Sequence, residues 1–254
     1  MSAEIRLPAG SGNDPVLRAE RITAGYGGLP IVSEVSVDVR PGEIVALLGP
    51  NGAGKSTFLK SLVGVVRVIS GNVFLGDEDI TNWSSEALAK RGVGYVPQVG
   101  DVFDPLTVAE NLDIGGYLLS PSQIPARIQE VCSMFPDLST MMKRRAAKLS
   151  GGERKMLAIA RVLMLDPSVL ILDEPTANLA PKVIDLILHT YVRRLAESGK
   201  SILLVEQRAH AAMEIADRTT VMVSGRIRIS GESADLLARA DFAELFLGGT
   251  HSIA

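Results

Sequence analysis

The sequence predicts an α/β fold with a mainly parallel core sheet, a small antiparallel β subdomain and an inserted helical lobe. Three runs that are apolar almost throughout, residues 44–48, 169–172 and 201–205, have the composition of buried parallel strands. Segments with helical spacing lie between them, as expected for strands joined by crossover helices. Residues 99–159 differ in character, because their helical spacing is punctuated by prolines, and they are predicted to form the inserted lobe.

We expect one domain after a short tail. Residues 1–13 are small, polar and glycine-bearing, and are predicted to form a flexible N-terminal tail. Residues 14–254 are predicted to form a single domain, which is long enough to bury a full core. In this domain, residues 14–98 and about 160–254 make up the sheet core with its antiparallel patch.

The first half of the chain alternates strands with turns. Residues 16–23 are predicted to form the first strand, and the strict alternation of residues 35–39 predicts a half-exposed second one. A Pro-Gly turn leads into the buried strand 44–48, and a helix follows it. Residues 72–75 complete the antiparallel patch, and residues 92–96 form a short strand that ends at Gln98.

The second half begins with the lobe and returns to the sheet. Residues 106–119 and 125–135 carry helical spacing within the lobe. Residues 181–198 are predicted to be a helix, with Pro181 in its first turn and a glycine at its C-terminal cap. Residues 220–223 add a strand, and residues 233–247 form a closing amphipathic helix or pair of helices.

Composition narrows the class of function. Twenty-six basic against 29 acidic residues give a net charge of −3, which argues against a broad basic surface for nucleic acid, so no nucleic-acid partner is expected. Cys132 is the single cysteine, which excludes an internal disulfide and fits a reducing compartment. The start of the sequence lacks the apolar segment of a signal peptide, and no run approaches the roughly 20 apolar residues of a membrane span. We therefore expect membrane association only through a partner.

A complete phosphate-binding loop follows the strand 44–48 and opens the next helix. Its residues are Gly49, Pro50, Asn51, Gly52, Ala53, Gly54, Lys55, Ser56 and Thr57. Glycines leave the backbone N–H groups free to surround an anion at a helix N-terminus. Lys55 would supply a charge for the β- and γ-phosphates, and the Ser56 hydroxyl would bind Mg²⁺. The alternative, a chance glycine-rich turn, is disfavoured because strand, loop, Lys-Ser and helix are all in register, so we expect a nucleoside triphosphate to bind.

Polar residues end the other core strands at the same edge of the predicted sheet. Gln98, the pair Asp173 and Glu174, and Gln207 each follow a strand, and ligands bind beyond the carboxyl ends of such strands. We expect Asp173 to bind Mg²⁺ and Glu174 to orient or deprotonate the attacking water. The alternative for this pair is a helix N-cap before Pro175, which the phosphate loop disfavours.

The segment Leu149-Ser150-Gly151-Gly152-Glu153 opens a further helix, and by itself it would be an ordinary capping box. Together with the loop, the glutamine and the Asp-Glu pair in this order, it resembles the ATPase domain of ABC transporters, over essentially the whole chain after the tail. The resemblance implies ATP and Mg²⁺ as cofactors. It also implies that Ser150, Gly151, Gly152 and Glu153 face the γ-phosphate bound by a second ATPase subunit.

Two further positions resemble functional residues of that family. Tyr26 is similar to the aromatic residue that stacks on adenine, although an isolated tyrosine in a turn is also common. Gln98 is similar to the glutamine that contacts Mg²⁺ and water and links the site to the helical lobe. The resemblance implies that this lobe receives a helix from a transmembrane permease subunit, at the cytoplasmic face of the membrane.

Two departures from the common family pattern suggest a subgroup. Ala180 replaces a common aspartate, and Gln207 replaces the usual histidine that contacts the γ-phosphate. Both resemble ATPase subunits of branched-chain amino-acid importers, which implies two different ATPases, two permease subunits and an extracytoplasmic binding protein. Homodimers, urea or amide importers and non-transport ABC ATPases are alternatives. We expect Gln207, rather than His210, to take the histidine's catalytic role beside Glu174 and Lys55.

Overall fold

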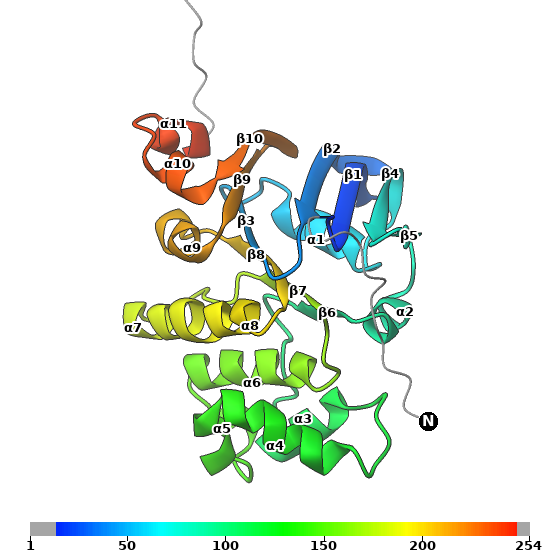
Figure 1. Ribbon diagram of the computed structural model, residues 1–254, viewed down its shortest axis with the longest axis vertical. Coiled ribbons are helices and arrows are strands. Elements are labelled where there is room, and N and C mark those ends of the chain that lie inside the picture. Colours follow the sequence, from blue (N-terminus) through cyan, green and yellow to red (C-terminus); the bar gives the residue numbers. More distant parts are fainter. Residues whose placement is uncertain (1–13, 248–254) are drawn as a thin grey trace, which may run out of the picture.

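The computed structural model describes residues 14–247, so the predicted tail, residues 1–13, lies outside the described residues. A six-stranded sheet with the order β10-β9-β3-β8-β7-β6 runs through the middle of the molecule (Figure 1). Its strands are β3 (Ile44–Leu48), β6 (Val93–Val96), β7 (Val169–Asp173), β8 (Ser201–Glu206), β9 (Arg218–Val223) and β10 (Arg226–Glu232). β10 pairs antiparallel with β9, and the other strand pairs are parallel. The predicted α/β class with a mainly parallel core sheet is confirmed.

The apolar runs become strands that are buried on both faces. Every residue of β3, β7 and β8 is buried. Successive side chains of a strand point to opposite faces, and in β3 Val45 and Leu47 join one hydrophobic core whereas Ala46 and Leu48 join the other. The first core contains α1 (Lys55–Leu62) and the antiparallel sheet, and the second contains the helical lobe. This two-sided burial holds the phosphate loop between two rigid layers.

A four-stranded antiparallel sheet with the order β2-β1-β4-β5 covers α1 on the side away from the lobe. It consists of β1 (Leu17–Tyr26), β2 (Leu29–Val39), β4 (Val68–Leu75) and β5 (Glu78–Asp79). β1 and β2 are longer than predicted and form a hairpin. Arg218 of β9 joins the two sheets, because its guanidinium bonds both Asp38 and Glu43.

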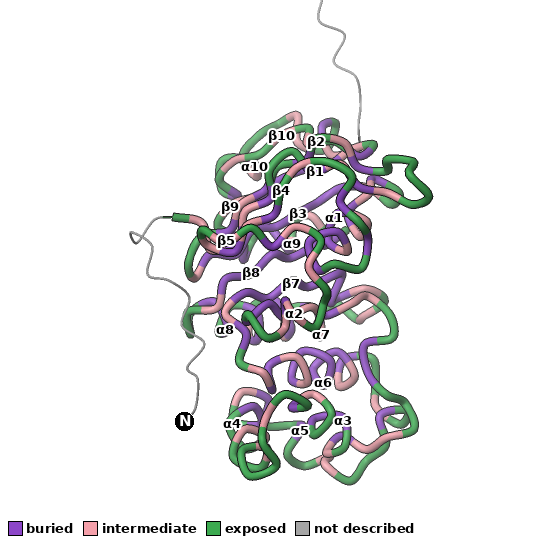
Figure 2. Tube along the Cα trace, turned by 90° about the vertical axis from the view of Figure 1, so that its right-hand side faces the viewer, coloured by how far each residue is buried: buried purple, intermediate pink, exposed green. Residues whose placement is uncertain are grey.

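The helical lobe lies at the opposite end of the molecule (Figures 1 and 2). It consists of α3 (Val108–Gly115), α4 (Ile124–Met134), α5 (Pro136–Thr140), a 3₁₀ turn (Ala146–Lys148) and α6 (Gly151–Leu163). α6 lies between the rest of the lobe and the core sheet and runs through the predicted boundary at residue 159. The buried Asn111 bonds to Phe103 and Thr107, and so fixes the segment that leaves β6 against α3.

The remaining helices surround the core sheet. They are α2 (Ser85–Lys90), α7 (Pro181–Asp185), α8 (Arg193–Glu197), α9 (Ala209–Ile215), α10 (Ser233–Leu237) and α11 (Phe242–Leu247). The predicted helix 181–198 is continuous but changes its winding, because Leu186–Val192 between α7 and α8 is π-helical. Tyr191 in this π segment packs on Phe135 of the lobe, with ring centroids 4.6 Å apart. The closing segment is a pair of helices.

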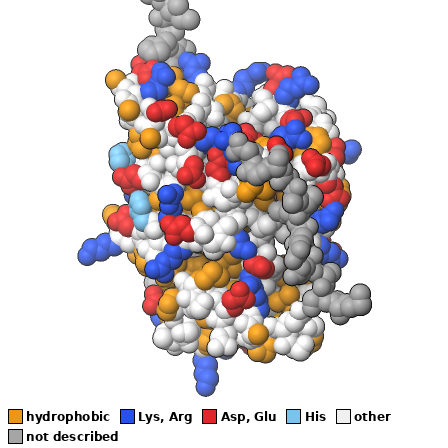
Figure 3. Space-filling view, viewed as in Figure 1, with side chains coloured by type: hydrophobic (Ala, Val, Ile, Leu, Met, Phe, Trp, Pro, Cys, Tyr) orange, Lys and Arg blue, Asp and Glu red, His pale blue; other side chains and the backbone are white. Residues whose placement is uncertain are grey.

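The described surface carries both signs of charge. On the face shown in Figure 3, basic and acidic side chains are interspersed and no large area carries one sign alone. Within residues 14–247, no helix is both long enough and apolar enough to cross a membrane.

Candidate nucleotide-binding site

The phosphate loop leaves β3 in a conformation that only glycine adopts easily. Gly49 has φ 154°, and a Cβ there would lie 2.1 Å from the carbonyl oxygen of Met222. Gly54 has φ 100° and caps the N-terminus of α1, and a Cβ there would lie 2.8 Å from Val32. The loop therefore brings its backbone N–H groups and the N-terminus of α1 to one concave surface, which suits an anion.

Lys55 is folded back over this loop. Its Nζ donates to the carbonyl oxygens of Gly49 at 2.7 Å and Pro50 at 3.1 Å, and lies 3.9 Å from Oε1 of Glu174. Burial lowers the pKa of Lys55, and the nearby carboxylates of Glu174 and Asp173 oppose that shift. A cation held by loop carbonyls can turn to a phosphate without leaving the site.

A cavity of about 580 Å³ lies over the loop. It is lined by Ile31, Asn51, Gly52, Ala53, Gly54, Lys55, Ser56, Thr57, Gln98, Glu174 and Gln207. The structure thus brings most of the predicted site residues together around one space. Ile31 is an addition that the sequence analysis missed, since no motif marks this residue of β2, which is 42% exposed.

The parallel register explains why the polar residues meet. Val96 pairs with Leu172, and Asp173 pairs with Val205, so the residues that follow these strands emerge at one edge. There Gln98 and Gln207 each donate a side-chain amide to Oε2 of Glu174 over 2.6 Å. One carboxylate is therefore fixed from two sides, at the rim of the phosphate loop.

Asp173 is buried beneath the loop. Its Oδ1 accepts from the Ser56 hydroxyl at 3.2 Å, and its Oδ2 accepts from the Tyr95 hydroxyl at 3.3 Å. Burial raises the pKa of Asp173, and the hydrogen bond from Ser56 opposes this. Burial and then the Asp173 charge raise the pKa of Tyr95, so its hydroxyl stays protonated. The Ser56 hydroxyl and the Asp173 carboxylate thus place oxygen atoms side by side, and Mg²⁺ prefers oxygen ligands. These residues therefore fit that ion.

The turn after β7 is held by an acid that the sequence analysis did not assign. Glu206 is 1% exposed, and its Oε1 accepts from the backbone N–H of Thr176 at 3.0 Å and from the Thr176 hydroxyl at 2.7 Å. Burial raises the pKa of Glu206. Glu174 has φ 49°, and its N–H donates to the carbonyl oxygen of Val205 at 3.0 Å. The adjacent residues Val205 and Glu206 thus hold both ends of the turn that carries Glu174.

Other predicted residues lie outside this cavity. Tyr26 ends β1, is 51% exposed and does not line the space. Ser150 and Glu153 form a capping box at the start of α6, in which the Ser150 N–H donates to Glu153 Oε2 at 2.7 Å. Gly151 and Gly152 follow in the first turn of α6. These four residues lie in the lobe. None of them lines the cavity of their own chain, so the Ser-Gly-Gly segment makes no contribution to it.

Comparison with protein families identifies the family to which this fold belongs. The model of the ABC transporter family matches residues 32–177, which is more than half of the chain. The chain belongs to the ABC transporter family. Members of this family hydrolyse ATP, and this ABC protein is an ATP hydrolase.

Relatives match this ABC ATPase over nearly their whole length. A probable branched-chain amino acid transport ATP-binding protein, LivF of Archaeoglobus fulgidus, is 42% identical and covers 92% of this chain and 99% of its own. BraG of Pseudomonas aeruginosa, a high-affinity branched-chain amino acid transport ATP-binding protein, is 38% identical, and the match covers 92% of this chain and 100% of BraG. LptB of Escherichia coli, a lipopolysaccharide export system ATP-binding protein, is 34% identical, and the match covers 91% of this chain and 97% of LptB. The crystal structure of a nucleotide-free ATP-binding cassette from an ABC transporter superposes with a TM-score of 0.81 at 29% identity. The superposition covers 92% of this chain and 100% of that cassette.

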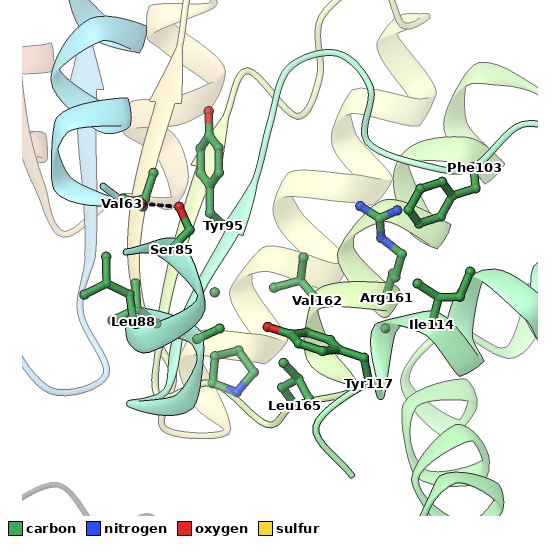
Figure 4. Close-up of a pocket in the computed structure, with 15 residues that line it drawn as sticks. Val63, Ser85, Leu88, Tyr95, Phe103, Ile114, Tyr117, Arg161, Val162 and Leu165 are labelled. Atoms are coloured by element: carbon green, nitrogen blue, oxygen red, sulfur yellow. Dashed lines mark hydrogen bonds between the residues drawn. The ribbon is translucent and has the colours of Figure 1, made fainter. Parts of the chain in front are cut away.

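A second cavity of this ABC ATPase, about 320 Å³, lies between the core and the lobe (Figure 4). We call it the interdomain groove. It is lined mainly by apolar residues of α2, β6, α3 and α6 and of the segments next to α3 and α6, including Leu88, Tyr95, Phe103, Ile114, Tyr117, Val162 and Leu165. The Arg161 guanidinium lies 4.8 Å from the centre of the Phe103 ring. Tyr95 therefore belongs to the wall of this groove and also contacts Asp173.

Proposed function

We propose that this chain is the ATP-hydrolysing subunit of an importer for branched-chain amino acids. The observation that supports hydrolysis here is the Glu174 carboxylate, which two amides hold beside the phosphate loop, next to Asp173 and Ser56. This is the arrangement that a water attacking a γ-phosphate requires, because a positioned base must lie close to the phosphate-binding backbone.

We assign roles in hydrolysis to residues of the cavity. The loop N–H groups and Lys55 bind the phosphates of ATP, and Ser56, Asp173 and Gln98 hold Mg²⁺. Bound Mg²⁺ neutralises charge on the β- and γ-phosphates. Glu174 accepts the proton of the attacking water, and Gln207 donates its amide to the γ-phosphate, as a neutral donor at any pH. Tyr26 would stack on adenine from outside the cavity, and Ile31 would pack against the base.

The active assembly is proposed to be a pair of ATPases with two nucleotides between them. Ser150, Gly151, Gly152 and Glu153 would complete the partner's site, as N–H and hydroxyl donors at the N-terminus of α6. Their place in the lobe, apart from the chain's own cavity, supports this role. The partner is a second, different ATPase subunit, or alternatively a second copy of this chain.

Transmembrane permease subunits are the proposed occupants of the interdomain groove. Phe103, Ile114 and Tyr117 line it and are 45%, 41% and 56% exposed, and apolar side chains grouped in this way mark an interaction site. A permease segment docked there would hold the chain at the cytoplasmic face of the membrane. An extracytoplasmic binding protein would deliver the amino acid to the permease.

The substrate class is inferred from the relatives. The proteins at 42% and 38% identity are described as branched-chain amino acid transport subunits, whereas the lipopolysaccharide exporter subunit is 34% identical. Gln207 stands where most members of the family have a histidine. This departure resembles the ATPase subunits of branched-chain amino-acid importers, and so it favours that substrate class. Import of urea, amides or another substrate is the alternative.

Deletion of the gene for this chain, followed by uptake assays, tests the proposal. Uptake of radiolabelled leucine should fall, and wild-type protein should restore it whereas Glu174→Gln should not. Urea and acetamide uptake, measured in parallel, should be unaffected. Normal leucine uptake in the deletion strain, with loss of urea or amide uptake, would replace the substrate assignment with the alternative.

A further inference from the structure

Tyr95 connects the interdomain groove to the nucleotide site. It lies in β6, next to β7, where it pairs with Ile171, two residues before Asp173. Tyr95 lines the groove, and its hydroxyl donates to Asp173 Oδ2 at 3.3 Å. Figure 4 shows the hydroxyl at the end of the ring that points away from Tyr117, the other tyrosine of the groove.

The two oxygens of Asp173 have different partners. Oδ2 accepts from Tyr95, and Oδ1 accepts from Ser56, the hydroxyl of the phosphate loop. A carboxylate held at one oxygen is fixed in rotation, so the other oxygen keeps its direction. Asp173 is only 2% exposed, so solvent would not readily replace a lost donor at Oδ2. The Tyr95 hydroxyl thus holds the oxygen of Asp173 that Ser56 does not bond.

We propose that Tyr95 is a positioning residue, which holds Asp173 ready for the divalent cation and makes this hold depend on what fills the interdomain groove. An occupant that presses on the ring would move the hydroxyl, and the hydroxyl would move the Asp173 carboxylate. The inference rests on the proposed role of Asp173 and on the groove as the docking site. It adds a direct path from the groove to the metal-binding acid, through one side chain.

Two tyrosine substitutions test the positioning role. Tyr95→Phe removes the hydroxyl and keeps the ring in the groove wall. Tyr117→Phe is the matched control, because Tyr117 lines the same groove, whereas it is Tyr95 that donates the hydrogen bond to Asp173 Oδ2. Binding of Mn²⁺ in the presence of ATP, measured by electron paramagnetic resonance, should weaken about 10-fold in Tyr95→Phe, since hydrogen-bond partners of metal ligands contribute at this level. It should be unchanged in Tyr117→Phe.

Binding of a fluorescent ATP analogue without metal separates this role from a merely structural one. Both variants should bind it as wild type does, with the same thermal unfolding midpoint. Wild-type Mn²⁺ affinity in Tyr95→Phe would overturn the positioning role. If wild-type protein itself failed to bind Mn²⁺ with ATP, the proposed function would fail instead, so the two failures are distinguishable.

Filling the groove chemically tests the second half of the proposal. Ala89 of α2 lines the groove, and Ala89→Cys in a Cys132→Ala background can be labelled there with N-ethylmaleimide. Labelling should change Mn²⁺ affinity about threefold or more when Tyr95 is present, a typical coupling between sites joined by a contact. The same label should have no effect when Tyr95→Phe is added. Equal effects in both backgrounds, or none in either, would show that the groove does not act through the Tyr95 hydroxyl.

Discussion

Gln207 donates its side-chain amide to Oε2 of Glu174 over 2.6 Å, although the two residues lie 33 positions apart and follow different strands, β8 and β7. Gln98 donates to the same oxygen over the same distance, and the other oxygen, Oε1, lies 3.9 Å from Lys55. Side chains of the protein therefore hold the Glu174 carboxylate in one direction. A base in this setting needs little rearrangement to meet a water beside the phosphates.

Glu174→Gln should keep ATP binding and lower the turnover number by about 10²–10⁴, the usual contribution of a general base. The amide has the same shape and can still hold a water, but it cannot accept the proton. Steady-state phosphate release and binding of a fluorescent ATP analogue measure the two properties. Turnover within about threefold of wild type would contradict the assignment of Glu174.

Gln207→Ala should lower turnover about 10-fold or more, because one donor at the γ-phosphate is lost. His210→Ala should retain wild-type turnover, since His210 has a side chain that is 78% exposed and pairs with Glu214 at 3.1 Å. Gln207→His should stay measurably active. Single-turnover hydrolysis of each variant decides the matter, and the reverse order of effects would show that His210 takes the role instead.

Glu206→Gln should gain stability relative to wild type as the pH rises. Burial raises the pKa of Glu206 in the folded state above its ordinary value of 4.5, so the folded protein holds this proton more tightly than the unfolded chain does. Its contribution to stability is therefore full below pH 4.5 and is lost as the pH rises through the folded-state pKa. Urea unfolding between about pH 5 and 8 should show the difference growing in favour of glutamine.

Glu197→Gln is the control for that series, because Glu197 is 66% exposed and its ion pair with Arg193 is long, at 3.8 Å. Exposed pairs contribute little to stability, so the unfolding free energy should stay parallel to wild type at every pH. A flat difference for Glu206→Gln as well would mean that the Glu206 proton is bound equally in the folded and unfolded states.

Two inactive variants should restore one another if the Ser-Gly-Gly segment serves a partner. Ser150→Arg keeps its own Glu174, and Glu174→Gln keeps its own Ser150, so a mixed dimer contains one complete site. Mixing them should give measurable hydrolysis, and wild-type activity should rise faster than linearly with concentration.

For an obligate heterodimer, adding the second ATPase should raise activity whereas adding more of this chain should do little. Linear activity from a monomer, checked by light scattering, would reduce the segment to a helix cap.

The sequence predicts the parts of this molecule that local composition determines. β3, β7 and β8 are buried on both faces, and their apolar runs predict them well. The β1–β2 hairpin extends to Tyr26 and Leu29, past the predicted strand ends, because register shifts accommodate residues that break the alternation. The π-helical winding of Leu186–Val192 depends on packing rather than on propensity, and so helical spacing alone could not predict it.

The same distinction applies to the site. Motif spacing brings Lys55, Ser56 and Glu174 to one edge of the sheet, since strand order and loop position follow from the chain. The Glu206–Thr176 contact and the Tyr95–Asp173 contact depend on which strands are neighbours and in what register. No motif gave Glu206 or Tyr95 a role, and therefore only the folded structure reveals these two contacts.

The left-handed backbone of Glu174 has a consequence for engineering this chain. At φ 49°, a residue other than glycine costs about 1 kcal/mol, so glycine would favour the folded state here. A screen that selects heat-resistant variants alone would then enrich replacements at the position that hydrolysis needs, since stability and activity conflict there. Stabilised forms of the protein should therefore be sought at other sites, with ATP turnover measured in every round of selection.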